Sequence, residues 1–375
     1  MTDLNRRQFT KLIFAAPAIL AAGRRVFAGT DAGFRFLVVG DSLVWGQGLE
    51  EKDKFYTLTR NWLATEAFGA PFDVDLKVKA HSGATLTLHK NEEDALSRAG
   101  KRETDKYDPE INVGFPSILR QLQVARDEYT AVGIALSDVR LIMLSGGITD
   151  ISVASILNPF GDNRQLESDI ERYCLKDMSI VLSRASELFP NAITAVIGYY
   201  PMISPKTSAH ELFNFTLEAY GFPRPLKPIA NNALTRQFFK VIKKRSLKRS
   251  RIWIEGSERN LRGAIERLNK ETGSTRAVYV KAPINESNTF GTGNGLLFEM
   301  VKKGRINDHF YDERKERCGP VLNDLKNTTG LRYPIRFCDM AAVGHPASEG
   351  SRAFMESIKA ALEPHLATLA NQTNR

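Results

Sequence analysis

The sequence predicts an α/β protein of three layers, in which helices cover both faces of a central five-stranded parallel sheet. Short apolar runs alternate with amphipathic stretches, and a strand that is buried on both faces is apolar throughout. Three of these runs end in small polar turns, at Ser42, Gly83 and Thr149. Because ligands of parallel sheets bind beyond the carboxyl ends of the strands, the three turns predict a single site.

The expected strands and helices follow one another along most of the chain. Strands are expected at 36–39, 72–78, 139–144, 192–199 and 277–280. Apolar residues at helical spacing predict helices at 55–68, 117–129, 166–189, 230–248, 258–270 and 354–369. Residues 86–114 are polar, which predicts a surface excursion, and 285–295 have the composition of a loop.

Length and composition allow a substantial core, since the chain has 375 residues and 42% of them are hydrophobic. One α/β domain with insertions and a domain with a small satellite both fit. The net charge is +9, but residues 1–28 hold five basic side chains against one acidic side chain, which leaves about +5 for the rest. This excess is too small to indicate a nucleic acid partner.

The first 28 residues have the pattern of an export signal. Arg6 and Arg7 lie in a segment that resembles a bacterial twin-arginine motif, followed by the apolar residues 12–22 and the small-residue cleavage pattern 26–28. The apolar stretch is too short for a membrane helix, which takes ~20 residues. We therefore expect the twin-arginine export machinery as a partner and a periplasmic or secreted bacterial protein.

Three cysteines are present, so at most one disulfide can form within the chain. Cys318 and Cys338 are the candidates because they flank the last functional segment, and Cys174 is then the free thiol. No Cys-x-x-Cys pair indicates a zinc site.

The stretch from Phe34 to Leu49 is the best place for a nucleophile. Its apolar strand ends at Gly40 and Asp41, and the turn that follows exposes Ser42 on a rigid support. The alternative is that Ser42 only caps the following helix. Asp41 is expected to be a structural carboxylate that accepts hydrogen bonds from nearby backbone.

The segment Gly40-Asp41-Ser42-Leu43 resembles the first block of the SGNH (GDSL) hydrolases, a flavodoxin-like, three-layer family of esterases and lipases. Gly83 stands where the family has its second-block glycine, and 147–150 stand where it has Gly-x-Asn-Asp. His345 and Pro346 precede the last expected helix. The resemblance covers 34–370 apart from insertions at about 86–114 and 203–275.

The resemblance implies a role for each matching residue. Ser42 would be the nucleophile and His345 the general base. The backbone N–H groups of Ser42 and Gly83, with the side chain of Thr149, would bind the oxyanion. The resemblance implies no metal and no organic cofactor.

Two positions depart from the family pattern. Thr149 replaces an Asn, and a hydroxyl is a single donor on a shorter arm. Ala342 stands where the family has an Asp three residues before the His, and the nearest upstream acid is Asp339. Asp339 orients the imidazole of His345 only if the loop curls back. A Ser–His dyad, with a backbone carbonyl fixing the tautomer, is the favoured arrangement.

The function expected from these residues is an exported serine esterase, or acylhydrolase, acting on a carboxylic ester of a small molecule, glycan or lipid. Two alternatives stay open: an O-acyltransferase on an envelope glycan, and a non-catalytic glycan- or lipid-binding protein of the same fold. The substrate's acyl chain and alcohol are not identified by the sequence.

A dense basic run is the remaining feature of note. It predicts either a solvated helix face or peripheral contact with an anionic membrane or an acidic polysaccharide. Its members are Lys240, Lys243, Lys244, Arg245, Lys248, Arg249 and Arg251.

Overall fold

The computed structural model describes residues 34–371 except 104–105, 209–211, 213–232 and 302–304. All of these residues belong to one unit of the chain, which begins at Gly33. The proposed export signal, 1–28, lies outside the described residues.

Five parallel strands form the central sheet in the order β2-β1-β3-β4-β5. This is the flavodoxin-like order, and it confirms the predicted sheet. The strands are β1 (Phe34–Gly40), β2 (Val74–Val78), β3 (Val139–Ser145), β4 (Ile193–Ile197) and β5 (Ala277–Val280). Strands β3 and β4 are buried along their whole length, which explains why their residues are almost all apolar.

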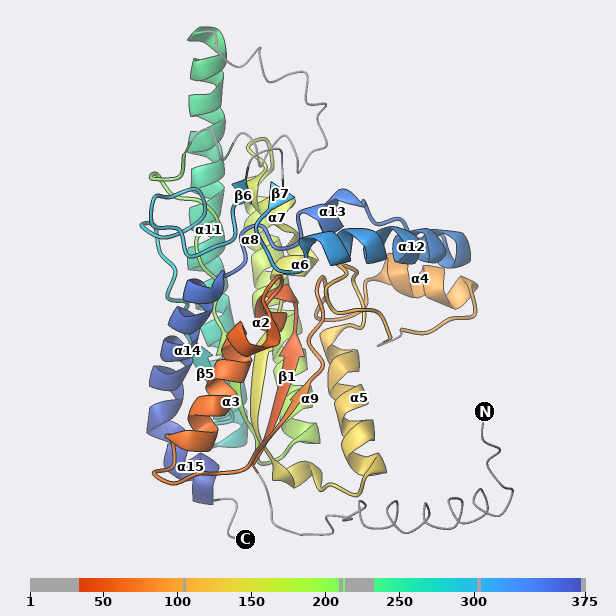
Figure 1. The fold of residues 1–375 in the computed structure, drawn as a ribbon, viewed down its shortest axis with the longest axis vertical. Coiled ribbons are helices and arrows are strands. Elements are labelled where there is room, and N and C mark those ends of the chain that lie inside the picture. The colour runs from red at the N-terminus through yellow and green to blue at the C-terminus, as the bar shows by residue number, and fades with distance from the viewer. Residues whose placement is uncertain (1–33, 104–105, 209–211, 213–232, 302–304, 372–375) are drawn as a thin grey trace, which may run out of the picture. The chain divides into compact units, whose positions relative to one another are not determined.

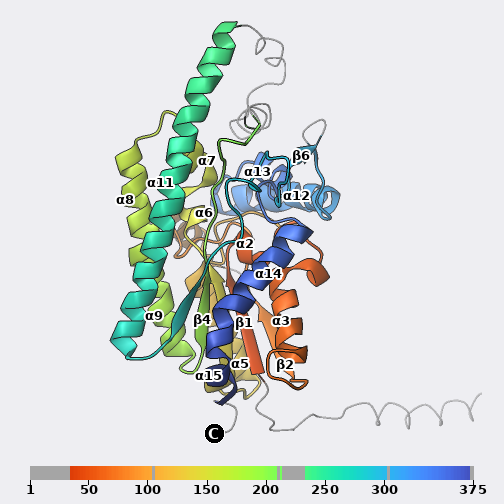
Figure 2. The same cartoon turned by 90° about the vertical axis from the view of Figure 1, so that its left-hand side faces the viewer.

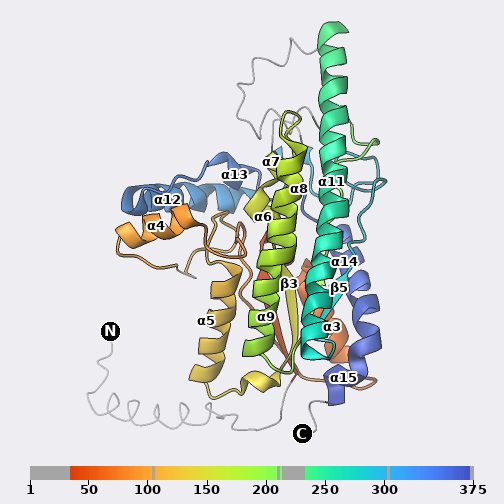
Figure 3. The ribbon, with the colours of Figure 1, turned by 180° about the vertical axis from the view of Figure 1, so that it is seen from behind.

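Helices cover both faces of the sheet, which confirms the three-layer architecture (Figures 1 and 3). One face carries α3 (Phe55–Thr65) and α14 (Ser348–Leu362). The other carries α5 (Ile118–Ala131), α9 (Met178–Leu188) and the carboxyl-terminal half of α11 (Ala233–Thr272). A single large core of apolar side chains lies between these helices and the sheet.

The remaining elements are short, apart from α12. The helices are α2 (Ser42–Trp45), α4 (Lys90–Arg98), α6 (Ile148–Ile151), α7 (Val153–Leu157), α8 (Asn163–Glu171), α12 (Tyr311–Thr329), α13 (Arg336–Asp339) and α15 (Leu366–Asn371). Two short antiparallel strands are β6 (Met300–Val301) and β7 (Arg305–Ile306). Single turns of 3-10 helix occur at Glu51–Asp53, Leu136–Asp138 and Glu363–His365, and a π-helical segment at Arg172–Asp177 joins α8 to α9. None of the helices in the described ranges is long and apolar enough to cross a membrane.

The prediction of two separate helices at 230–248 and 258–270 is wrong, because α11 runs unbroken through the interval between them. Gly256 lies within this helix, where its missing side chain leaves room for Ile170 of α8 at 3.1 Å from the position of a Cβ. Trp253 is fully buried in the core, so packing holds the helix together across the glycine.

The prediction that 86–114 form a surface excursion is only partly right. Helix α4 lies in this segment, and Ile111 and Val113 are buried in a second apolar cluster with Leu322 of α12. Helix α12 was not expected from the sequence. Pro320 lies inside it, and proline in a helix interior removes a backbone hydrogen bond.

Candidate active site

The nucleophile candidate lies where β1 passes into α2. Asp41 is the N-cap of α2 and accepts a hydrogen bond from the Leu43 N–H at 3.0 Å, so Ser42 is the first residue of the helix. The helix is therefore capped by Asp41. The alternative hypothesis, that Ser42 serves only as the helix cap, is wrong. Ser42 is 6% exposed.

Three polar side chains, those of Ser145, Tyr199 and Gln121, form hydrogen bonds with this turn. Asp41 is fully buried and accepts hydrogen bonds from the Ser145 hydroxyl at 2.5 Å and the Tyr199 hydroxyl at 2.9 Å. Burial raises the pKa of Asp41, and these hydrogen bonds act in the opposite direction. Gln121 of α5 bonds both backbone groups of Gly40, accepting from its N–H at 2.7 Å and donating to its carbonyl at 3.1 Å. Asp41 is structural, as expected.

Ser42 and His345 meet although 303 positions separate them, with 2.7 Å between Ser42 Oγ and His345 Nε2. The loop that carries His345 is fixed through its backbone. The carbonyl of His345 accepts from the Phe298 N–H at 2.8 Å, and its N–H donates to the Ala342 carbonyl at 3.0 Å. The Tyr200 hydroxyl donates to the Gly344 carbonyl at 2.7 Å.

The other ring nitrogen of His345, Nδ1, is buried and has no hydrogen-bond partner among the described residues. Burial lowers the pKa of His345 to about 4, against a weaker opposite effect of the Ala341, Ala342 and Val343 backbone. No described hydrogen bond or ion pair joins Asp339 to His345, since Asp339 ends the short helix α13 and is partly exposed. Asp339 therefore does not orient the imidazole in this structure, and no carboxylate of the described residues forms a hydrogen bond or ion pair with His345.

Two backbone N–H groups are free for an oxyanion. Within the described residues, neither the Ser42 N–H nor the Gly83 N–H donates to another group of the protein. Gly83 follows β2 and has a φ of +82°, a conformation that glycine adopts without strain. A Cβ at this position would overlap the side chain of Asn112 and the backbone of Val113. Only glycine fits this turn.

Thr149 is close to the predicted site, but its hydroxyl is already engaged. It donates to the Ala84 carbonyl at 2.6 Å, and a hydroxyl has one proton to give. The neighbouring Asp150 accepts from the Leu86 N–H at 3.2 Å and lies 3.3 Å from His89 Nε2. Thr149 and Asp150 thus tie the loop after β3 to the loop that carries Gly83, and in this arrangement Thr149 is not an oxyanion donor.

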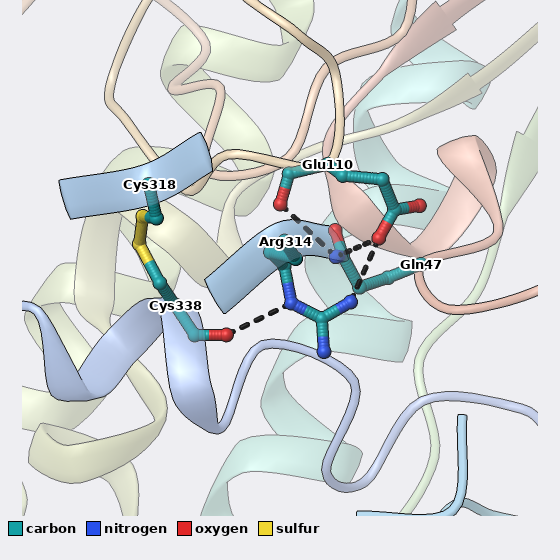
Figure 4. The surroundings of a disulfide bond; sticks show 5 residues. All are labelled: Gln47, Glu110, Arg314, Cys318 and Cys338. Atoms are coloured by element: carbon teal, nitrogen blue, oxygen red, sulfur yellow. Dashed lines mark hydrogen bonds and ion pairs between the residues drawn. A yellow bond between two sulfur atoms is a disulfide. The ribbon is translucent and has the colours of Figure 1, made fainter. Parts of the chain in front are cut away.

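A buried ion-pair network supports the site from the side of α12 (Figure 4). The guanidinium of Arg314 has no solvent exposure and donates to Glu110 at 2.9 Å and to Asp308 at 2.9 and 3.1 Å. Its Nε donates to the Cys338 carbonyl at 2.8 Å. Glu110 accepts in turn from the Gln47 amide at 2.6 Å. The network therefore joins the loop after the nucleophile to the segment just before His345.

A disulfide between Cys318 and Cys338 ties α12 to α13 beside this network, as predicted, and Cys174 is free and buried. Arg314 and Glu110 were not predicted as site residues from the sequence. Arg314 lies in the charged run 312–317 and Glu110 in a polar segment, and both are the usual pattern of a solvent-exposed surface.

Two other histidines lie near the site, one buried and one exposed. His81 is buried, and its Nδ1 lies 2.8 Å from the Ser82 carbonyl oxygen. His309 is exposed and lies 3.7 Å from Glu50. In the part of the chain that the structure describes, no cluster of three or more His, Cys, Asp or Glu side chains is arranged to hold a metal ion.

Comparison with protein-family models finds no match, and comparison with curated protein sequences finds none either. Solved structures give low-identity matches. An extracellular lipase from Streptomyces rimosus is 12% identical, with 88% of this chain and 100% of the lipase covered and a TM-score of 0.42. Phospholipase A1 from Streptomyces albidoflavus NA297 is 11% identical, with 88% and 99% covered and a TM-score of 0.41.

A family two carbohydrate esterase from Clostridium thermocellum, solved in complex with cellohexaose, is 11% identical. The match covers 89% of this chain and 65% of that protein, with a TM-score of 0.39. The solved structures that resemble this chain include lipases and esterases.

Proposed function

We propose that this protein is an exported serine esterase that cleaves carboxylic esters through an acyl-enzyme on Ser42, with His345 as the general base. The observation that carries the proposal is the 2.7 Å contact between Ser42 Oγ and His345 Nε2. A serine hydroxyl needs a base to take its proton, and the tetrahedral intermediate needs donors for its oxygen. The contact with His345 supports the first requirement, and the unbonded N–H groups of Ser42 and Gly83 support the second.

In the first half of the reaction, Ser42 Oγ bonds to the carbonyl carbon and its proton passes to His345 Nε2. This requires the tautomer with the proton on Nδ1. The carbonyl oxygen becomes an oxyanion that accepts from the N–H groups of Ser42 and Gly83. When the intermediate collapses, the bond to the alcohol breaks and His345 gives its proton to the leaving oxygen.

In the second half, water attacks the acyl carbon while His345 takes its proton. The bond to Ser42 Oγ then breaks, the carboxylic acid leaves, and the proton returns to Ser42. With two oxyanion donors and no carboxylate partner for the imidazole, we expect modest turnover. Removing one such donor from an enzyme costs on the order of 10²–10³ in rate.

Export of the mature chain is part of the proposal and rests on 1–28. The disulfide between Cys318 and Cys338 supports it, because stable disulfides are typical of proteins outside the cytosol. Replacing Arg6 and Arg7 with Lys should retain the protein in the bacterial cytoplasm, as measured by cell fractionation. Unchanged export of this variant would contradict the twin-arginine route.

The test of the chemistry uses a short p-nitrophenyl ester and a fluorophosphonate probe. Ser42→Ala and His345→Ala should each lower kcat/KM by at least about 10³-fold, and Ser42→Ala should lose the label, as measured by intact-protein mass. Ser274→Ala and His365→Ala are the matched controls and should keep full activity. Because Asp41 caps α2, the Ser42 variant should keep the wild-type circular dichroism.

Three results would contradict the proposal in different ways. Full activity in Ser42→Ala excludes this nucleophile. A wild-type protein that is neither labelled nor active is a non-catalytic protein of this fold. A labelled protein that releases its acyl group only to an added acceptor alcohol is an acyltransferase.

A further inference from the structure

The amino-terminal half of α11 carries a strongly basic surface. Every charged residue from 233 to 254 is Lys or Arg. Lys240, Lys244 and Lys248 are exposed and lie four residues apart, so they follow one face of the helix. Among the described residues, none of the three forms an ion pair with an acid. We call these three residues and Arg245 the cationic stripe.

The opposite face of this helix half is anchored to the rest of the protein. The Ser246 hydroxyl donates to the Leu157 carbonyl at 2.7 Å, and the Ser250 hydroxyl donates to the Ile203 carbonyl at 3.2 Å. The Lys243 ammonium donates to the Thr207 carbonyl at 2.6 Å. The helix therefore presents its cationic stripe to solvent in a fixed orientation, and the stripe is not needed for anchoring.

Exposed apolar side chains border the cationic stripe. Phe160, in the link between α7 and α8, is 67% exposed, and the Arg245 guanidinium lies 6.0 Å from its ring centroid. Val241 is 50% exposed on the helix itself. Cations attract any polyanion, but an aromatic ring held in water beside them is stabilised when it enters the interface of a lipid bilayer. An aromatic ring also stacks on sugar rings, but the exposed aliphatic Val241 beside it favours the apolar layer of a bilayer.

This surface lies at the same end of the sheet as the candidate active site. Figures 1 and 2 show the amino-terminal half of α11 extending past the carboxyl ends of the strands, which is the end where β1 runs into α2.

We propose that the amino-terminal half of α11, together with Phe160, docks onto the surface of an anionic phospholipid membrane. The cationic stripe supplies the attraction to the headgroups, and Phe160 and Val241 enter the interfacial layer. Docking does not depend on ester cleavage, so it is measurable in the Ser42→Ala protein even if the proposed chemistry is wrong.

Sedimentation with lipid vesicles tests the proposal, using the Ser42→Ala protein without its export signal. It should bind vesicles that contain phosphatidylglycerol and leave phosphatidylcholine vesicles unbound. The triple variant Lys240→Gln, Lys244→Gln and Lys248→Gln should bind on the order of 100-fold more weakly, because each lysine near an anionic surface contributes about a fivefold gain. Added salt should weaken binding, since the attraction is screened.

Two controls separate the cationic stripe from net charge. Lys270→Gln, Lys281→Gln and Lys326→Gln remove the same charge from exposed positions elsewhere and should leave binding unchanged. Phe160→Ser keeps the charge and should weaken binding to the anionic vesicles. The proposal is overturned if the two triple variants bind equally, if Phe160→Ser has no effect, or if the protein binds soluble alginate but no vesicle.

Discussion

At the scale of single residues, the pKa of His345 controls the pH dependence of the proposed reaction. Burial lowers this pKa to about 4, and within the described residues no carboxylate contacts the imidazole to raise it again. The base is active when neutral, so kcat/KM should stay constant from neutral pH down to about pH 5 and fall by half near pH 4. A pH profile of p-nitrophenyl ester cleavage checks this. An acid limb at pH 6.5 or above would indicate a carboxylate partner that the structure does not place there.

Thr149 gives the second prediction at this scale. Because its hydroxyl donates to the Ala84 carbonyl, Thr149→Val should lower kcat less than about tenfold. Loss of a true oxyanion donor costs on the order of 10²–10³, so a drop of that size would identify Thr149 as a donor. Thr149→Asn, which offers an amide with longer reach, should raise kcat. Steady-state kinetics of both variants on the same ester decide the question.

The residues of the site differ in how far the sequence could place them. Ser42, Gly83 and His345 were predictable because each follows a strand or precedes a helix that its local pattern defines. The direction of the Thr149 hydroxyl was not predictable, because its acceptor, the Ala84 carbonyl, belongs to the loop after a different strand. The position of Asp339 was not predictable either, since the short helix α13 fixes it through contacts with α12.

At the scale of elements, the buried ion pairs of Arg314 predict that loss of this side chain lowers both the stability of the fold and the activity of the site. Arg314→Met removes the cation that pairs with Glu110 and Asp308 and leaves two buried carboxylates unpaired. The expected loss in the free energy of unfolding is roughly 3–5 kcal/mol, measured by urea denaturation. Glu110 bonds Gln47 next to the nucleophile turn, so kcat/KM should also fall in the folded fraction of the variant.

Arg317, on the same helix, is the matched control. It pairs with Asp108 at 2.7 Å, but its side chain is 55% exposed. Exposed pairs contribute less than about 1 kcal/mol, so Arg317→Met should unfold almost as the wild type does. Equal losses in the two variants would mean that helix α12, and not the buried charge, determines the effect.

The same elements show the limit of reading local patterns. Helix α12 has an apolar face that only becomes a core face when Leu322 meets Ile111 and Val113 from the segment 86–114. Each segment alone is mostly polar. Its few apolar residues form a core only together with those of the other segment, which is distant along the chain. Helix α11 shows the reverse case. The sequence predicts two helices at 230–248 and 258–270, yet the helix continues through Gly256, where a Cβ would lie 3.1 Å from Ile170.

At the scale of the whole molecule, the sheet was predictable because its central strands are short apolar runs buried on both faces, while the edge strand β2 alternates apolar and charged residues. The layers follow from the helices between the strands. The basic half of α11 was also visible in the sequence, but only the structure separates anchored residues such as Arg249 from exposed ones such as Lys248.

Buried histidines make the stability of the folded protein sensitive to acid. Burial lowers the pKa of His81 to about 4, while the same residue in the unfolded chain has a pKa of about 6.5. Between these values the unfolded state binds a proton that the folded state does not, so stability falls as the pH falls through this window. The effect of one such histidine is about 1.4 kcal/mol for each pH unit. His345 acts in the same direction.

His81→Asn isolates this contribution, because Asn keeps a side-chain N–H donor and does not titrate. From pH 7 to pH 5, its free energy of unfolding in urea should fall by about 2 kcal/mol less than that of the wild type. His365→Asn, at a partly exposed position in the turn Glu363–His365, should show the wild-type dependence. Parallel curves for the wild type and His81→Asn would mean that His81 is protonated inside the fold, next to the loop that holds Gly83.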